Sequence, residues 1–187
     1  FDSEHATLSG PQDVYIHDGR IAALYPAGSR ASAPMPSIDG SGRVLLPGLF
    51  DMHTHESAWN VLLDLAAGVT TVRDMGNDNR TLAGLAQDIE AGRLAGPRIV
   101  AAGFIEGDSP HAARADFVVK DLDEAKAAVD WYAQHGYPQV KLYNSMRPEW
   151  MAPVAQYAHE RGLRVSGHVP AFARAEDAVR AGYDELQ

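Results

Sequence analysis

Segments typical of β-strands alternate with segments typical of α-helices through most of this chain of 187 residues. The predicted strands are residues 45–55, 69–73, 98–102, 139–143 and 163–168, with the beginning of a sixth at 182–186. The predicted helices are residues 57–67, 81–91, 121–134, 148–161 and 174–181. Because parallel strands need a crossover between them, the alternation predicts right-handed βαβ units and a parallel sheet. Either a doubly wound sheet or a (β/α)8 barrel contains such units.

Local signals mark the ends of the predicted helices. Gly68 and Gly92 each follow a helical segment, where glycine commonly terminates a helix. Asp121 and Glu124 have the spacing of a capping box, which predicts that a helix begins there. Pro148 suits the first turn of the next helix, since proline lacks an N–H that this turn leaves unpaired.

The beginning of the chain has a different pattern. Residues 13–17 and 20–24 are apolar runs that flank Asp18-Gly19. A two-residue type I′ turn requires positive φ at both positions, which Asp and Gly tolerate. These residues therefore predict a β-hairpin.

Further turn signals and a third apolar run follow this hairpin. Residues 26–36 are rich in Ala, Ser, Gly and Pro and predict a loop. A turn at 38–40 then precedes a predicted strand at 43–46. We therefore expect residues 1–45 to be part of a small β domain and residues 46–187 to form the α/β unit.

Composition excludes several kinds of partner. A net charge of −9 disfavours nucleic acid and anionic membrane surfaces, since both attract clustered Lys and Arg. No apolar run approaches the roughly 20 residues of a membrane span. There is no cysteine, so any metal site must use His, Asp, Glu or a modified Lys. The chain begins with Phe1, so we expect an upstream segment, and the compartment stays open between cytoplasm and periplasm or secretion.

Two histidines end the first predicted strand. In an extended strand, side chains alternate faces, so Asp51, His53 and His55 project from one face. Two neighbouring imidazoles form half of a metal site, although two unrelated histidines are the alternative.

Other polar residues also stand at predicted strand ends, where ligands bind in both architectures. They are Arg73, Asp74, Glu106, Asp108, Lys141, Tyr143 and His168. No glycine-rich nucleotide-binding motif follows any strand, which disfavours nucleotide-binding versions of the fold.

Four segments together resemble the amidohydrolase superfamily of metal-dependent hydrolases, most closely the imidazolonepropionase-like and prolidase-like members with a small N-terminal β domain. They are LPGLFDMHTH at 46–55, AGVTTVRDMG at 67–76, QVKLY at 139–143 and VSGH at 165–168. The resemblance implies an incomplete (β/α)8 TIM-type barrel, about its first five to six βα units, preceded by part of the β domain.

The resemblance also implies roles for single residues. His53 and His55 would hold the more buried of two divalent metal ions, with zinc the first choice and manganese or iron open. Lys141, carboxylated by carbon dioxide, would bridge the two ions, and His168 would bind the second. The alternatives are a surface lysine in a salt bridge and a packed histidine.

Two further residues are candidates for substrate binding. Tyr143 lies two positions beyond Lys141 and therefore faces the same interior, although simple packing is the alternative. His111 follows the third strand in a polar segment and is a candidate for the mouth of the site, with a surface loop position as the alternative.

The family places another metal-binding histidine at the end of strand six and a catalytic aspartate at the end of strand eight. Neither occurs within 187 residues, so we expect a longer enzyme and little activity from this chain alone. For the intact protein the resemblance implies hydrolysis of a C–N bond in a peptide-like or cyclic amide by a hydroxide that bridges the metals. A dipeptidase is one enzyme of this kind. An ester or lactone hydrolase and a non-catalytic scaffold are the alternatives. The expected partners are a small-molecule or short-peptide substrate and a second copy of the chain in a homo-oligomer.

Overall fold

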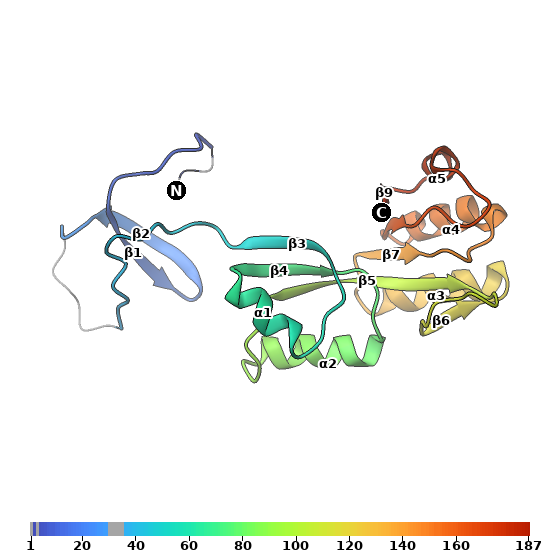
Figure 1. The fold of residues 1–187 in the computed structure, drawn as a ribbon, viewed down its shortest axis with the longest axis horizontal. Coiled ribbons are helices and arrows are strands. Elements are labelled where there is room, and N and C mark those ends of the chain that lie inside the picture. The colour runs from blue at the N-terminus through green and yellow to red at the C-terminus, as the bar shows by residue number, and fades with distance from the viewer. Residues whose placement is uncertain (1, 3, 30–35) are drawn as a thin grey trace. The chain divides into compact units, whose positions relative to one another are not determined.

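The computed structural model describes residues 2, 4–29 and 36–187 and separates the chain into two compact units (Figure 1). The first unit is Phe1–Pro47 and the second is Gly48–Gln187. Phe1 and residues 30–35 of the predicted loop lie outside the described residues.

The first unit contains the predicted hairpin. Strand β1 (Gln12–His17) pairs antiparallel with β2 (Arg20–Pro26). Asp18 has φ 49° and Gly19 has φ 69°, the positive values that a type I′ turn requires. The hairpin prediction is therefore confirmed.

The predicted strand at residues 43–46 is wrong, because these residues belong to no strand or helix. The strand begins later, with β3 (Leu49–Thr54), where the N–H of Leu49 donates to the Gly68 carbonyl. Pro47 has no N–H to give to a sheet, so the apolar run before it is a connecting segment.

The second unit is a curled parallel sheet, and helices connect its strands along the sequence. Its other strands are β4 (Val69–Asp74), β5 (Arg98–Gly107), β6 (Phe117–Val119), β7 (Gln139–Leu142), β8 (Arg164–Gly167) and β9 (Glu185–Leu186). The order β3-β4-β5-β7-β8-β9 follows the chain without a reversal. A doubly wound sheet reverses its order, whereas a barrel does not, so the prediction of a partial (β/α)8 barrel is confirmed.

Strand β5 extends five residues beyond its predicted end and changes neighbours along its length. Arg98–Ala101 pair with β4, whereas Ala102–Ile105 pair with β7. The short strand β6, which the sequence analysis missed, pairs with the last residues of β5. This extension brings Glu106 into the sheet rather than into the loop that follows it.

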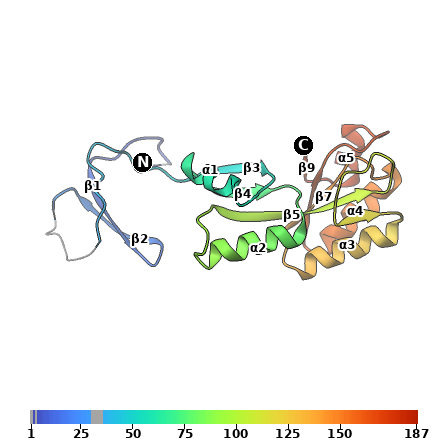
Figure 2. The ribbon, with the colours of Figure 1, turned by 60° about the horizontal axis from the view of Figure 1, so that its bottom comes forward.

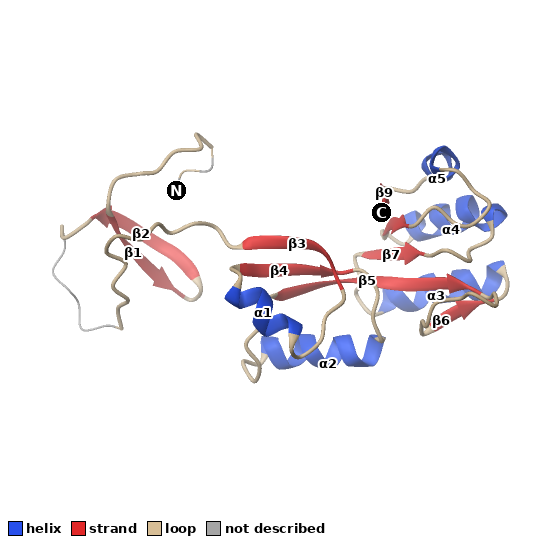
Figure 3. Ribbon diagram, in the orientation of Figure 1, coloured by secondary structure: helices blue, strands red, loops and turns tan. Residues whose placement is uncertain are grey.

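Five helices accompany the sheet. They are α1 (Asn60–Ala66), α2 (Asn79–Glu90), α3 (Leu122–Gln134), α4 (Pro148–Glu160) and α5 (Ala175–Ala181). Figures 2 and 3 show α2 and α3 along the same side of β5.

Asp121 caps α3 by accepting from the N–H of Glu124, as predicted, while the Glu124 carboxylate accepts from the backbone N–H of Lys120. Among the described residues, no helix has the length and apolarity to cross a membrane.

The core lies between the sheet and these helices. Val140 and Leu142 of β7 are fully buried in it, together with Tyr132 of α3. Burial of such side chains stabilises the fold by about 1.5–3 kcal/mol each. Because neighbouring strand residues face opposite sides, Lys141 between the two apolar residues points to the concave side of the sheet.

Candidate metal centre

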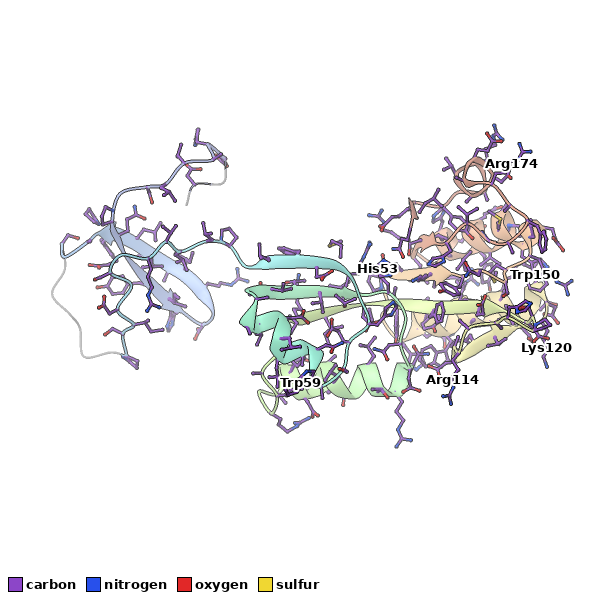
Figure 4. The ribbon with its side chains drawn as sticks, in the orientation of Figure 1. His53, Trp59, Arg114, Lys120, Trp150 and Arg174 are labelled. Carbon is purple, nitrogen blue, oxygen red and sulfur yellow. The ribbon has the colours of Figure 1, made fainter. Side chains whose placement is uncertain are left out.

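The ends of β3, β7 and β8 bring five predicted site residues together. Lys141 Nζ lies 3.5 Å from His53 Nε2 and 5.3 Å from the centre of the Tyr143 ring. The rings of His53 and His55 have centroids 5.5 Å apart, and those of Tyr143 and His168 are 4.2 Å apart. Figure 4 shows His53 where β3 ends, next to β7. We call these five residues the strand-end cluster.

Lys141 is the most unusual member of the cluster. Its side chain is 2% exposed, and no ion pair to it occurs among the described residues. Burial lowers the pKa of its ammonium group; Asp74 opposes this shift and the charge of Arg73 adds to it. A buried cation without an ion-pair partner is costly, so burial shifts the equilibrium of Lys141 toward the neutral amine. The alternative of a surface lysine in a salt bridge does not describe this side chain.

His55 has a fixed orientation. Its Nδ1 lies 2.6 Å from the carbonyl oxygen of Gly76. A carbonyl only accepts hydrogen bonds, so Nδ1 carries the proton and Nε2 keeps its lone pair. The N–H of Gly76 donates in turn to Asp74 Oδ1 at 3.0 Å. This arrangement matches the common pattern in which one ring nitrogen of a metal-binding histidine is held by a backbone carbonyl.

The pKa values of two cluster histidines are lowered. Burial is the main cause for His53, followed by the charge of Lys141. Burial is also the main cause for His168, followed by Lys141 and then His53. Both imidazoles are therefore favoured in the neutral form, which is the form that binds metal ions.

The donor set fits a metal centre only if Lys141 changes its chemistry. Among the described residues, no three His, Asp or Glu side chains converge closely enough to hold an ion by themselves. An ammonium group beside His53 has no lone pair to give a metal. A carbamate on the same nitrogen would offer two anionic oxygens at this position, and the lowered pKa of Lys141 favours the neutral amine that this reaction needs.

His111 is not brought into the cluster. It is exposed in the segment after β5, and its backbone N–H donates to Ser109 Oγ at 3.1 Å. No contact between its side chain and the strand-end cluster occurs within the described part of the chain.

Sequence reasoning noted Asp74 and Glu106 at strand ends but gave them no role. Both carboxylates are fully buried. Asp74 accepts from the N–H groups of Glu56 and Gly76 and from the Asn77 amide. Their position at the end of a strand was the one signal that could have identified them, since most of their partners are backbone N–H groups, which leave no mark in the sequence.

Parallel strands that follow the chain in order, with polar groups at their carboxyl ends, define the second unit as part of a (β/α)8 barrel of the kind found in many enzymes. Residues 44–185 match the Amidohydrolase family. The chain therefore belongs to the amidohydrolase family.

Individual relatives agree with this family. An imidazolonepropionase of Ectopseudomonas mendocina is 48% identical over 50 residues, which are 26% of this chain and 12% of that protein. An adenine deaminase of Chelativorans sp. is 30% identical over an alignment of 176 positions that covers 84% of this chain and 28% of that protein. A solved structure from Bifidobacterium longum, named provisionally as a prolidase, is 26% identical with a TM-score of 0.68 and covers 90% of this chain and 46% of its own. The chain thus spans less than half the length of each of these relatives.

Proposed function

We propose that this chain belongs to a metal-dependent hydrolase that cleaves a C–N bond in a peptide-like or cyclic amide. The observation that carries the proposal is the buried amine of Lys141, without an ion-pair partner among the described residues, 3.5 Å from His53 Nε2. Support comes from the relatives, since one is named as an adenine deaminase and another provisionally as a prolidase.

Lys141 acquires its ligand atoms by reaction with carbon dioxide. The nitrogen lone pair of the neutral amine forms an N–C bond to carbon dioxide, and one proton leaves the nitrogen for solvent. The product is a carbamate with one negative charge and two oxygens. The depressed pKa of Lys141 favours this step, because it enlarges the fraction of neutral amine at a given pH.

The histidines of the strand-end cluster have separate metal-binding roles in this proposal. His53 and His55 would hold one divalent cation, the Lys141 carbamate would supply oxygens to both cations, and His168 would contribute its Nε2 to the second. The two cations, zinc as first choice, would supply a Lewis acid for the scissile carbonyl and a lowered pKa for water.

Tyr143 is the candidate substrate contact. Its ring packs edge-on against Phe104, with centroids 4.9 Å apart, and lies beside His168. These contacts hold the ring on the concave side of the sheet, within reach of a group bound between Lys141 and His168. A phenolic hydroxyl there would donate a hydrogen bond to a substrate carboxylate or carbonyl.

The test combines detection of the carbamate with metal analysis of the full-length protein. After incubation with 13C-bicarbonate, we expect a carbamate carbon resonance, about two metal ions per chain, and hydrolysis of dipeptides or cyclic amides in preference to esters. Lys141→Met should lose all three properties. Lys120→Met, a change at an exposed lysine, is the matched control and should keep them. A metal-free wild-type protein with unmodified Lys141 would favour a non-catalytic scaffold instead.

A further inference from the structure

The ring of His168 has a second partner besides Tyr143. Its Nδ1 lies 2.9 Å from Oδ1 of Asn144, two positions after the end of β7. An amide oxygen accepts but does not donate, so the proton of the imidazole is on Nδ1. The lone pair of Nε2 then remains free, as it does in His55.

Asn144 is itself held from two sides. Its backbone carbonyl accepts from the N–H of Ala171, in the segment that follows β8. The N–H of His168 donates to the Leu142 carbonyl. The turn after β7 and the segment after β8 are therefore joined by backbone hydrogen bonds on both sides of the contact between Asn144 and His168.

Glu106 anchors this turn from the other neighbouring strand. Its carboxylate is fully buried and accepts three backbone hydrogen bonds, from Gly107 at 2.9 Å, Ala113 at 2.9 Å and Ser145 at 2.8 Å. The bond to Ser145 fixes the residue directly after Asn144. Gly107 lies so close to the turn that an added Cβ would be 2.0 Å from the Ser145 carbonyl oxygen.

We propose that Asn144 and Glu106 are positioning residues for His168: Asn144 holds the proton on Nδ1, and Glu106 holds Asn144 in place. The proposal rests on the proposed function, in which His168 binds the second metal ion. In this proposal neither residue binds the metal or the substrate. Removal of such an outer partner typically lowers metal affinity or activity by about 10–100-fold.

The test reads the tautomer of His168 in metal-free, full-length protein carrying 15N-labelled histidine. His168→Gln identifies its resonances among those of the eight histidines of this chain. We expect the Nδ1–H form in the wild type and in Asn144→Asp, which retains an acceptor. Asn144→Leu should shift the ring toward the Nε2–H form and weaken zinc binding by about tenfold. Asn144 is exposed, so this variant leaves the core intact.

Glu106→Gln tests the second step. Gly107 and Ser145 donate to one oxygen and Ala113 to the other, so the new NH2 group faces at least one of these donors. The turn should therefore move, and the tautomer should change in the same direction as in Asn144→Leu. Asn79→Leu is the matched control, since Asn79 bonds Tyr132 and Tyr137 and contacts no member of the cluster in the described structure.

The outcomes separate this proposal from the proposed function. A pure Nδ1–H tautomer in Asn144→Leu would overturn the positioning role, as would an equal change in Asn79→Leu. A wild type that binds no metal but shows the Asn144-dependent tautomer would overturn the proposed function and keep the positioning role.

Discussion

Arg73 of β4 and Glu185 of β9 form a bidentate ion pair although 112 positions separate them in the sequence. One of the two bonds, from Nη1 to Oε2, is 2.6 Å long. Arg73 also donates through Nε to the Met52 carbonyl of β3 at 2.8 Å. One guanidinium therefore joins the first two strands of the sheet to its last strand.

The pair predicts a pH-dependent contribution to stability. Hydrogen bonds from Arg73 lower the pKa of Glu185 from 4.5 to about 2. A lowered carboxyl pKa stabilises the fold fully above the unfolded value and loses this effect as the pH falls through the folded value. Glu185→Gln should therefore reduce the free energy of unfolding by about 1–3 kcal/mol at neutral pH, and the difference should shrink between about pH 4.5 and pH 2.

Urea denaturation at several pH values measures this difference. Asp88→Asn is the control, since it breaks the exposed pair with Arg93, which should contribute less than about 1 kcal/mol. Equal losses in the two variants would contradict the prediction.

Two glycines should respond in opposite ways to the same substitution. A Cβ on Gly103 of β5 would lie 2.4 Å from the buried ring of Tyr132, so Gly103→Ala should destabilise the protein by about 2–3 kcal/mol. Gly84 in α2 has nothing within 4 Å of its added Cβ, so Gly84→Ala should stabilise it by about 0.5–1 kcal/mol. Thermal unfolding of both variants checks the signs, and a neutral Gly103→Ala would show that Tyr132 can move aside.

Asp74 should affect His55 without touching it. Asp74→Asn places an NH2 group where an oxygen now accepts from Glu56, Gly76 or Asn77. We expect a loss of about 1–3 kcal/mol in stability, since a buried donor is left without an acceptor, together with weaker metal binding through the shifted Gly76 carbonyl. Calorimetry and zinc titration measure the two effects. Asp108→Asn, at an exposed position, should change neither.

Removal and return of the metal should reveal the carbamate. Under the proposed function, a chelator should abolish hydrolysis by the full-length protein, and zinc with bicarbonate should restore it faster than zinc alone, because a Lys141 carbamate would have to form again before it could bridge two ions. Activity assays during reconstitution test this expectation. Recovery at the same rate in carbon dioxide-free buffer would contradict the role given to Lys141.

Much of the fold could be predicted from the sequence, because turns, helix ends and strand alternation each depend on a few neighbouring residues. The two residues Asp18-Gly19 are sufficient to predict the hairpin turn. Val140, Lys141 and Leu142 alternate faces as a strand requires. Glu106 illustrates what sequence could not provide. Its three partners are backbone N–H groups, one of them 39 positions away at Ser145, and a backbone donor leaves no mark in the sequence. The apolar run at 43–46 has the composition of a strand but belongs to no strand of the described structure, so composition alone led to a wrong prediction there.

Strand β5 connects the two halves of the candidate site, because it pairs with β4 along one part of its length and with β7 along the other. His53 and His55 stand at the end of β3, which pairs with β4, and β4 in turn pairs with Arg98–Ala101 of β5. Lys141 lies on β7, which pairs with β5 from Ala102 onward, and His168 follows β8, which pairs with β7. The distance of 3.5 Å between Lys141 Nζ and His53 Nε2 thus depends on how both neighbouring strands are aligned with β5. A slip of one residue on either side of β5 would turn a whole strand over. The spacing between the proposed metal-binding residues therefore depends on a strand that contributes none of them.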